Sequence, residues 1–386
     1  MAHSRGKEFL KTMSYNTAKT EESFSFYVRS SVHLMLHVAG VTFHDYYTDP
    51  RAGIKVFGAD SFRKADDMFD GILEPVGIGT PAISYGHLSS LGFELVFPDG
   101  MGEVNYVRQE KSPDEWIQLL QQDISLSVLG QFFLDYRDKL KDAYPGRDVS
   151  WNMGYQGPLT SAYELRDMDI FCDPYDDMAK TKKFLDAVGL STSRYIRMYR
   201  EINGVPQFME SAGMCDDVAS MFPPKLWEEL VLPYWDRFYR NLTDGTRHLH
   251  CEDMTVDHVK FLDRLGISRF DPSVSHKLTP GKIKANTSVP FAWRLVDFHY
   301  SEMTRQDVRD WVFKAVEEGA SEVFTYATNL HADNEGIGKV KEFHQAAGLV
   351  QQMMKEGATR EDIGKMVSQQ GRKRFFDNWP HPREMI

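Results

Sequence analysis

The sequence predicts an α/β fold, a (β/α)8 barrel of the TIM type with an N-terminal helical extension. In its second half, short apolar stretches with strand character alternate with amphipathic helical stretches. This alternation repeats too often for a sandwich or a helical bundle, and it favours parallel strands that close into a barrel. The predicted strands cover residues 93–97, 149–153, 207–211, 248–250, 267–270, 291–296 and 322–327.

The chain is predicted to form one domain after a short tail. Residues 1–22 are polar and are expected to be a flexible tail, and residues 23–386 form the single domain. Within it, residues 23–120 are mainly helical, with one strand before the turn signal Pro98-Asp99-Gly100. Residues 121–372 are the expected barrel core.

Two helices of the core are well marked. In the first, residues 307–318, Thr304 precedes an apolar face at helical spacing as a cap, and Gly319 ends the helix. The second covers residues 337–355. A third helical pattern follows residue 254 and ends at Gly266.

Composition and charge restrict the class of partner. The chain has 386 residues and a formal net charge of -11, which repels phosphate backbones and excludes nucleic acid as the main partner. The three cysteines Cys172, Cys215 and Cys251 are far apart and odd in number, as expected in a reducing compartment. No apolar run approaches the ~18 residues that span a bilayer. We therefore expect a cytoplasmic protein that acts on a small molecule and has no membrane partner. The sequence leaves open whether the protein forms a homodimer.

The most concentrated set of ligand types lies at residues 247–254. His250 and Glu252 stand two apart at a strand end, so their side chains point to the same side and offer nitrogen and oxygen to one ion. His248 and Cys251 are reserve ligands in the same segment. In the alternative interpretation, the segment is a solvated turn that caps the next helix, and Cys251 is a buried thiol or a nucleophile.

Further polar residues follow the other predicted strands. On a barrel, residues at or after the strand ends converge on one pocket. Asp216, Asp217 and Tyr163 also have simpler explanations, as helix caps or core packing. The predicted pocket residues are Asn152, Tyr163, Asp216, Asp217, Asp297 and His299, and the predicted distant metal ligand is His331.

Several segments carry a resemblance to a known family. The segment 209–219, with Asp216-Asp217-Val218-Ala219, and the following segment 222–234 resemble the "DD-x-A … SP-x-x-[FW]-x-x-x-x-x-P-Y" region of the uroporphyrinogen decarboxylase superfamily. Gly157-Pro158-Leu159-Thr160 is similar to its "GP-x-T" strand end. Residues 46–50 and 91–97 resemble the "YY-x-DP" and "LG-x-x-V-x-F" elements, and the whole resemblance covers residues 26–372 in order.

The resemblance implies a barrel enzyme of one of two kinds, a tetrapyrrole decarboxylase or a zinc-dependent methyltransferase working with a corrinoid protein. The decarboxylases carry an Arg-Gln-Ala-Gly-Arg element that this sequence lacks. In their "FSDIL" segment, Gly71 takes the place of the aspartate. The thiol-methylating members hold zinc through a His-x-Cys pair, whereas here Glu252 replaces that cysteine. The departures favour the methyltransferase branch.

A nitrogen and oxygen site is harder than a sulfur site and suits an oxygen substrate. We therefore expect transfer of a methyl group from an O-methyl compound, such as a methoxylated aromatic, to a corrinoid protein supplied in trans, with His250, Glu252 and Asp217 as catalytic residues. Asp297-Phe298-His299 lacks the glycine of a corrinoid-binding signature, so no cobalamin domain is placed in this chain. Methyl transfer from a methylcorrinoid to tetrahydrofolate or a thiol, and decarboxylation of a tetrapyrrole or aromatic carboxylate, stay as alternatives.

Overall fold

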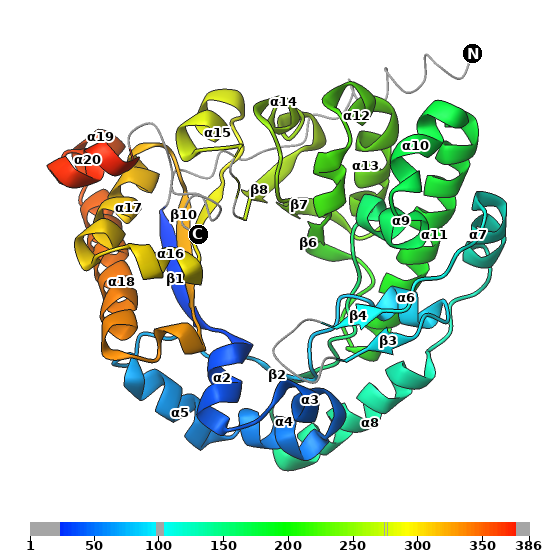
Figure 1. Cartoon of the computed structure of the whole chain (residues 1–386), viewed down its shortest axis with the longest axis horizontal. Coiled ribbons are helices and arrows are strands. Elements are labelled where there is room, and N and C mark those ends of the chain that lie inside the picture. Colours follow the sequence, from blue (N-terminus) through cyan, green and yellow to red (C-terminus); the bar gives the residue numbers. More distant parts are fainter. Residues whose placement is uncertain (1–23, 98–103, 274, 276, 376–386) are drawn as a thin grey trace.

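The computed structural model describes residues 24–97, 104–273, 275 and 277–375, so the predicted tail lies outside the described residues. Helices form the outside of a ring, and the longer strands stand inside them (Figure 1). The strands are β1 (Ser25–Ser30), β2 (Ile78–Gly79), β3 (Leu95–Val96), β4 (Asn105–Tyr106), β5 (Val149–Ser150), β6 (Met209–Cys215), β7 (Thr243–His250), β8 (Ile267–Asp271), β9 (Ala292–Leu295) and β10 (Glu322–Ala327).

Parallel pairing dominates. Two three-stranded parallel sheets have the orders β6-β7-β8 and β1-β10-β9, β2 pairs with β5 in parallel, and β3 pairs with β4 antiparallel. A single parallel bridge between Phe270 and Phe291 connects β8 to the start of β9. The α/β class with parallel sheets is confirmed. The described strands form four sheets, so their closure into one eight-stranded barrel stays a prediction.

Helices connect and cover the strands. From the first half of the chain come α2 (Val32–Ala39), α3 (Phe43–Thr48), α4 (Pro50–Val56), α5 (Ala59–Met68), α6 (Gly86–Ser90), α7 (Pro113–Leu120), α8 (Val128–Ala143), α9 (Pro158–Arg166), α10 (Asp169–Asp176) and α11 (Met178–Ile202). From the second half come α12 (Pro224–Leu230), α13 (Leu232–Arg240), α14 (Val256–Val259), α15 (Pro280–Asn286), α16 (Asp297–Glu302), α17 (Arg305–Glu317), α18 (Asn334–Lys355), α19 (Arg360–Gly364) and α20 (Gln369–Phe375), with 3-10 helices η1 (Asp217–Met221), η2 (Asp263–Leu265) and η3 (Asn329–His331).

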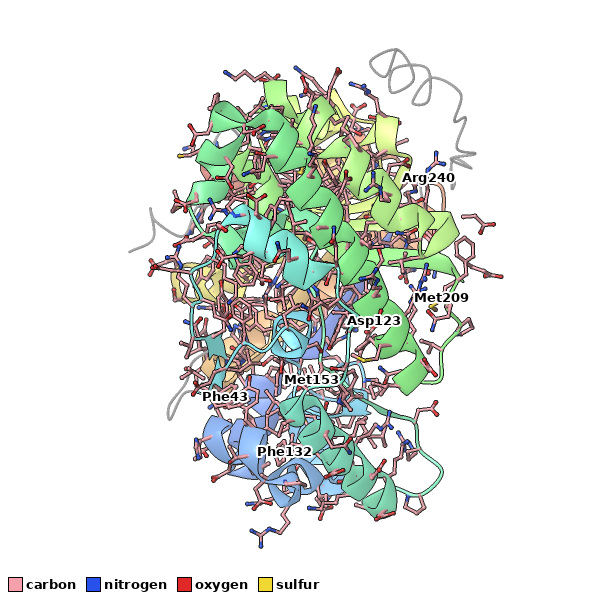
Figure 2. The ribbon with its side chains drawn as sticks, turned by 90° about the vertical axis from the view of Figure 1, so that its right-hand side faces the viewer. Phe43, Asp123, Phe132, Met153, Met209 and Arg240 are labelled. Atoms are coloured by element: carbon pink, nitrogen blue, oxygen red, sulfur yellow. The ribbon has the colours of Figure 1, made fainter. Side chains whose placement is uncertain are left out.

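The view from the side shows one edge of the molecule, where β6 begins (Figure 2). Met209, at the start of β6, lies at the same edge as Arg240, at the end of α13. The main-chain N–H of Met209 donates to the carbonyl of Leu242, just before β7 begins. Because β6 and β7 are parallel, both strands begin at this edge and their C-terminal ends lie together away from it.

The predicted helices agree with the structure where their ends carry capping residues. Thr304 accepts a hydrogen bond from the N–H of Asp307 in a capping box, so α17 begins at Arg305. Gly319, with φ +115°, follows its end, and Gly266, with φ +63°, follows η2. The helical pattern before Gly266 is split between α14 and η2, whereas the sequence predicted one helix.

The N-terminal part was predicted with a single strand, and the structure adds β1, β2 and β4 among its helices. Strand β1 has two aromatic residues and one β-branched residue, Phe26, Tyr27 and Val28, but it follows the polar tail and precedes a run of helices, so the sequence pattern predicted no strand there. Phe26 packs edge-on against His344 of α18, and Tyr27 stacks on Phe324 of β10. This packing, from a segment almost 300 residues away, fixes β1 beside β10. The 25-residue helix α11 was likewise not predicted from the sequence.

In the described part of the chain, every helix falls short of the length or apolar character needed to cross a bilayer.

Candidate metal centre at the ends of three parallel strands

Three neighbouring parallel strands end level with one another, and each carries a polar residue at its last position. Cys215 ends β6, His250 ends β7 and Asp271 ends β8. The register pairs Cys215 with His250 and His250 with Asp271. The residue before each one is buried in the hydrophobic core, so the alternation of a strand turns these three side chains to the opposite face.

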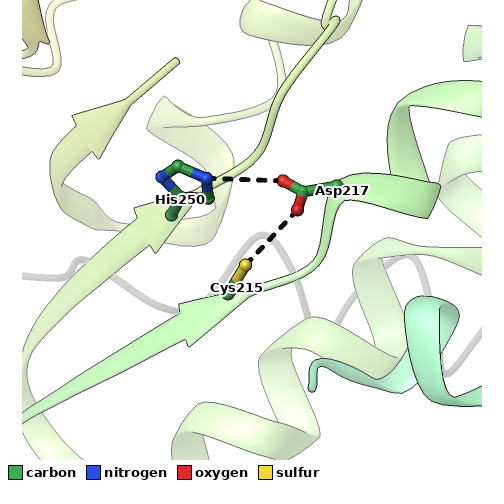
Figure 3. Close-up of side chains that lie close together, drawn as sticks. All are labelled: Cys215, Asp217 and His250. Carbon is green, nitrogen blue, oxygen red and sulfur yellow. Dashed lines mark hydrogen bonds and ion pairs between the residues drawn. The ribbon is translucent and has the colours of Figure 1, made fainter. Parts of the chain in front are cut away.

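Asp217, two residues beyond the end of β6, completes a compact group (Figure 3). The Cys215 thiol donates to Asp217 with a Sγ to Oδ2 distance of 3.4 Å, and Oδ1 of Asp217 lies 3.7 Å from Nε2 of His250. One ligand atom of each of these three residues lies within 4.8 Å of the other two. A sulfur, an oxygen and a nitrogen at these separations are a donor set that binds zinc in proteins.

A second layer of contacts orients His250. Its Nδ1 lies 3.1 Å from Oδ2 of Asp271, and the main-chain N–H of Ser273 donates to the other oxygen of Asp271 at 2.8 Å. Nε2 of His250 is therefore directed to Asp217 and to Glu252, whose Oε1 is 3.6 Å away. A carboxylate on one ring nitrogen and a ligand site at the other is the arrangement that fixes the tautomer of metal-binding histidines.

The electrostatics of the group favour a positive charge at its centre. Burial lowers the pKa of His250, but the hydrogen bonds to Asp271 and Glu252 outweigh it and raise the pKa to about 10. Burial and the neighbouring Asp217 raise the pKa of the Cys215 thiol. Without a cation, the group thus keeps a proton on each of these side chains. A divalent cation displaces both protons when it binds thiolate and neutral imidazole.

Asp216 has a different environment from Asp217 although the two are adjacent. It is fully buried, and its carboxylate accepts hydrogen bonds from the main-chain N–H groups of Leu159 and Thr160, at 3.1 and 2.6 Å, and from the Trp235 indole. Burial raises the pKa of Asp216 to about 6, although these hydrogen bonds oppose the shift. Asp216 therefore satisfies the first turn of α9, whose own cap, Gly157, offers no side chain.

This contact explains the glycine of the Gly157-Pro158 pair. A Cβ atom at Gly157 would lie 2.4 Å from the Cβ of Asp216, which leaves no room for a larger residue. The main-chain N–H of Gly157 also donates to the carbonyl of Cys215 at 2.6 Å. The start of α9 is thereby tied to the end of β6, next to the candidate metal centre. The placement of Asp216 favours a scaffold role, and its predicted contact with substrate stays a prediction.

The predicted metal ligands occupy different places. Glu252 adjoins the centre: besides its contact with His250, its N–H donates to Oδ1 of Asp217 at 2.9 Å. The Cys251 thiol is buried, donates to the main-chain carbonyl of Asp216, and has a pKa raised well above its usual value by burial, so it is unsuited to act as a nucleophile. His248 is two residues back along β7, where burial and Arg269 lower its pKa.

His331 lies in η3, after the last strand of the other large sheet. Its Nδ1 accepts from the N–H of Thr328 at 3.1 Å, and its ring packs edge-on against Tyr300 at 4.6 Å. In the described residues, the compact group of ligand atoms consists of Cys215, Asp217 and His250 and leaves His331 out. Its predicted role as the distant ligand stays a prediction.

The other predicted pocket residues make contacts of their own. The Asn152 side chain donates to the carbonyl of Thr80 at 2.8 Å, and the Tyr163 ring packs against Phe171 at 6.0 Å. Asp297 begins α16, and His299 is buried on the same helix. The alternative that Tyr163 packs its ring agrees with this placement. Convergence of these residues with His250 stays a prediction.

Sequence reasoning missed Cys215 and Asp271. Both stand at the end of a strand, directly before or after residues that were singled out, and the pair Asp271-Pro272 follows a predicted strand. The end of β6 was predicted four residues too early, so Cys215 fell outside the strand. The signal was therefore present in the position of these polar residues at strand ends.

Comparison with known proteins supports the fold. No family model matches the chain, and no curated protein matches it. Among solved structures, the chain is similar to a methyltransferase from Methanosarcina mazei, with a TM-score of 0.60 and 14% sequence identity over 88% of this chain and 96% of that chain. At this identity the likeness concerns the fold, because one fold serves many chemistries.

Proposed function

We propose that this protein is a methyltransferase that moves a methyl group from the oxygen of a methoxylated aromatic compound to the cobalt of a separate corrinoid protein. The observation that carries the proposal is the group of Cys215, Asp217 and His250 at the C-terminal ends of parallel strands, in a fold similar to that of a named methyltransferase. We further propose that the parallel strands belong to one (β/α)8 barrel, whose substrates bind at this end.

The residues of the centre fit a zinc ion. They supply sulfur, oxygen and nitrogen donors, and Glu252 is a fourth donor beside His250. A bound zinc supplies Lewis acidity, which stabilises the negative charge that develops on the ether oxygen as the methyl group leaves. The chain itself orients the donors, because Asp271 holds His250 and the N–H of Glu252 holds Asp217.

The proposed methyl transfer is a nucleophilic displacement at the methyl carbon. The methyl carbon forms a bond to cobalt(I), which supplies the electron pair and becomes methylcobalt(III). The bond between the methyl carbon and the aryl oxygen breaks, and its electron pair stays on that oxygen. The phenolate then takes up a proton from water. An aryl oxide leaves poorly without charge stabilisation, so the centre acts on the step that limits the uncatalysed reaction.

A second function is favoured by Cys215. The sequence predicted a hard site of nitrogen and oxygen, whereas the compact group contains one sulfur. Sulfur makes a site softer and better suited to bind and activate a thiol. Transfer of a methyl group from a methylcorrinoid protein to a thiol acceptor is therefore the second candidate.

One experiment separates the two. The full-length, zinc-loaded protein is mixed with a reduced corrinoid protein and a panel of methoxyarenes, and methylcobalt(III) absorbance and free phenol are recorded. We expect both products, and we expect Cys215→Ser to lower the rate on the order of 100-fold because a metal ligand is lost. Cys172→Ser is the matched control, since Cys172 is exposed on α10.

Methylation of a thiol by methylcobalt(III) without release of phenol from any methoxyarene would favour the second candidate. If neither reaction occurs while zinc is bound in stoichiometric amount, both functions are rejected.

A further inference from the structure

The inward faces of β1, β9 and β10 form a wall of aromatic rings with a guanidinium on it. The Tyr27 ring stacks on Phe324 at 4.8 Å, and Tyr326 meets Tyr27 edge-on at 6.4 Å. The guanidinium carbon of Arg294, on β9, lies 5.0 Å from the centre of the Tyr326 ring. The flat rings and the cation above them offer a surface to an aromatic anion.

Arg294 differs from the other two arginines of this region in its partners. Arg29 pairs with Glu74 at 2.9 Å, and Arg269 pairs with Glu322. Among the described residues, Arg294 has no carboxylate within ion-pair distance, and its Nε is buried without an acceptor. A buried donor without an acceptor destabilises the protein, and the cost is larger for a charged group. A ligand with an acceptor would remove this cost.

The sheet register places Arg294 two residues beyond the level of His250, on the side of the strand ends that carries the candidate metal centre. Asp271 is paired with His250, and the parallel bridge between Phe270 and Phe291 sets Asp271 level with Ala292. Arg294 lies two residues further along β9, so it stands roughly 7 Å beyond the level of His250, toward the C-terminal ends of the strands. β8 lies between β7 and β9, so His250 and Arg294 are separated sideways by two strand spacings, roughly 10 Å.

The electrostatics agree with this geometry. The protein carries a net charge of -11, so an anionic ligand needs a local cation to be held. Arg294 is such a cation.

We propose that Arg294 binds the carboxylate of the substrate, which makes the substrate class a methoxylated aromatic carboxylate. Its ring would lie against Tyr326, with its ether oxygen toward Cys215 and His250. A planar guanidinium matches a carboxylate in a two-point hydrogen-bonded pair, and such pairs are stronger than neutral hydrogen bonds. This inference deepens the proposed function and rests on it for the role of the ether, whereas anion binding by Arg294 stands on the geometry alone.

The test measures binding apart from methyl transfer. Benzoate and its neutral analogue benzamide are titrated into the full-length, zinc-loaded protein by calorimetry. We expect benzoate to bind more tightly than benzamide by about 10- to 100-fold, as charged hydrogen bonds provide, and Arg294→Gln to abolish the preference. Arg294→Lys keeps the positive charge but lacks the planar guanidinium, and it should retain part of the preference for benzoate.

Arg29→Gln is the matched control, because Arg29 also lies over a tyrosine, at 4.7 Å, but already has a carboxylate partner. It should leave the preference within about twofold. A preference unchanged in Arg294→Gln would overturn the inference, as would equal binding of benzoate and benzamide by the natural protein. If Arg294→Gln does not fold, Arg294→Lys decides: a full preference in that variant contradicts the two-point pairing.

The two proposals fail separately. If the preference depends on Arg294 but methoxybenzoates yield no phenol with reduced corrinoid protein, the proposed reaction falls and the anion site stands. If phenol is released equally well from methoxybenzoates and from their neutral amides, and Arg294→Gln changes neither, the reaction stands and the anion site falls.

Discussion

Two three-stranded parallel sheets, β6-β7-β8 and β1-β10-β9, share a backbone arrangement (Figure 1), but they differ in the side chains that they present. In the first, the polar groups stand at the strand ends and hold one another in place by hydrogen bonds. Asp271 contacts His250 at 3.1 Å, and Asp217 accepts from Cys215 at 3.4 Å. This sheet holds ligand atoms at fixed separations.

In the second sheet, charged groups lie along the strands and over aromatic rings. Arg29 lies over Tyr27 and Arg294 over Tyr326. Aromatic faces attract a cation without neutralising it, so Arg294 keeps its charge for a further partner. The backbone arrangement is thus the same, and the side chains set the difference. The first sheet presents ligand atoms for a metal cation, and the second presents a guanidinium for an anion.

The largest expected effect is on zinc binding, when a histidine of the first sheet and a histidine after the second sheet are replaced in turn. His250→Ala removes a donor of the compact group and should weaken zinc binding on the order of 100-fold or more. His331→Ala, after β10, should leave zinc binding nearly unchanged if Cys215, Asp217 and His250 suffice. Zinc content after dialysis against a competing chelator gives the comparison. Equal loss in both variants would show that the sheets share one metal, as the sequence suggested.

The sequence predicted part of this site for a physical reason. His250 and Glu252 are near in the chain, so their proximity follows from strand geometry alone. His250 and Asp271 are 21 residues apart and meet through the register of two strands, which a single sequence does not fix. The strand β10 was predicted with its observed bounds because its central residues, Val323 to Tyr326, are all β-branched or aromatic. Its partner β1 was missed, because only packing against α18 and β10 distinguishes it from the surrounding helical pattern.

The next effect concerns pH. The pKa of His250 in the metal-free protein is about 10, above its value of about 6.5 in an unfolded chain, so its stabilisation is present below pH 6.5 and is lost as pH rises toward 10. In the presence of a chelator, the urea midpoint should fall over this window. His250→Gln should flatten the fall, apart from the share of Cys215, whose raised pKa acts in the same direction.

Zinc affinity should rise with pH, whereas the urea midpoint of the metal-free protein falls, because the metal displaces the protons of His250 and Cys215. Each displaced proton adds up to about tenfold in affinity per pH unit while the group is protonated. Competition titrations between pH 6.5 and 9 measure the slope. A zinc affinity independent of pH would contradict ligation by these two side chains.

A smaller effect tests the scaffold beneath the first sheet. Gly157→Ala places a Cβ 2.4 Å from that of Asp216 and should destabilise the protein by about 1–3 kcal/mol through overpacking. Gly189→Ala, within α11, is the control: its Cβ meets nothing within 4 Å, and it should stabilise the helix by about 0.5–1 kcal/mol. Urea unfolding compares the two. Equal free energies of unfolding for both variants would mean that α9 does not depend on its contact with β6.

The smallest expected effect is in the second sheet. Glu74→Gln removes the partner of Arg29, whose side chain is 44% exposed against 47% for Glu74. At that exposure, water screens the pair, and the free energy of unfolding should change by less than about 1 kcal/mol.

The Glu74→Gln variant also leaves Arg29 over Tyr27 without its carboxylate partner, which is already the situation of Arg294 over Tyr326. If anion binding in this sheet depends on a guanidinium without a carboxylate partner, the variant should bind benzoate at least as tightly as the natural protein. Weaker benzoate binding would show that Glu74 helps to position the aromatic wall. It would also show that the absence of a carboxylate partner is not what distinguishes Arg294 from Arg29.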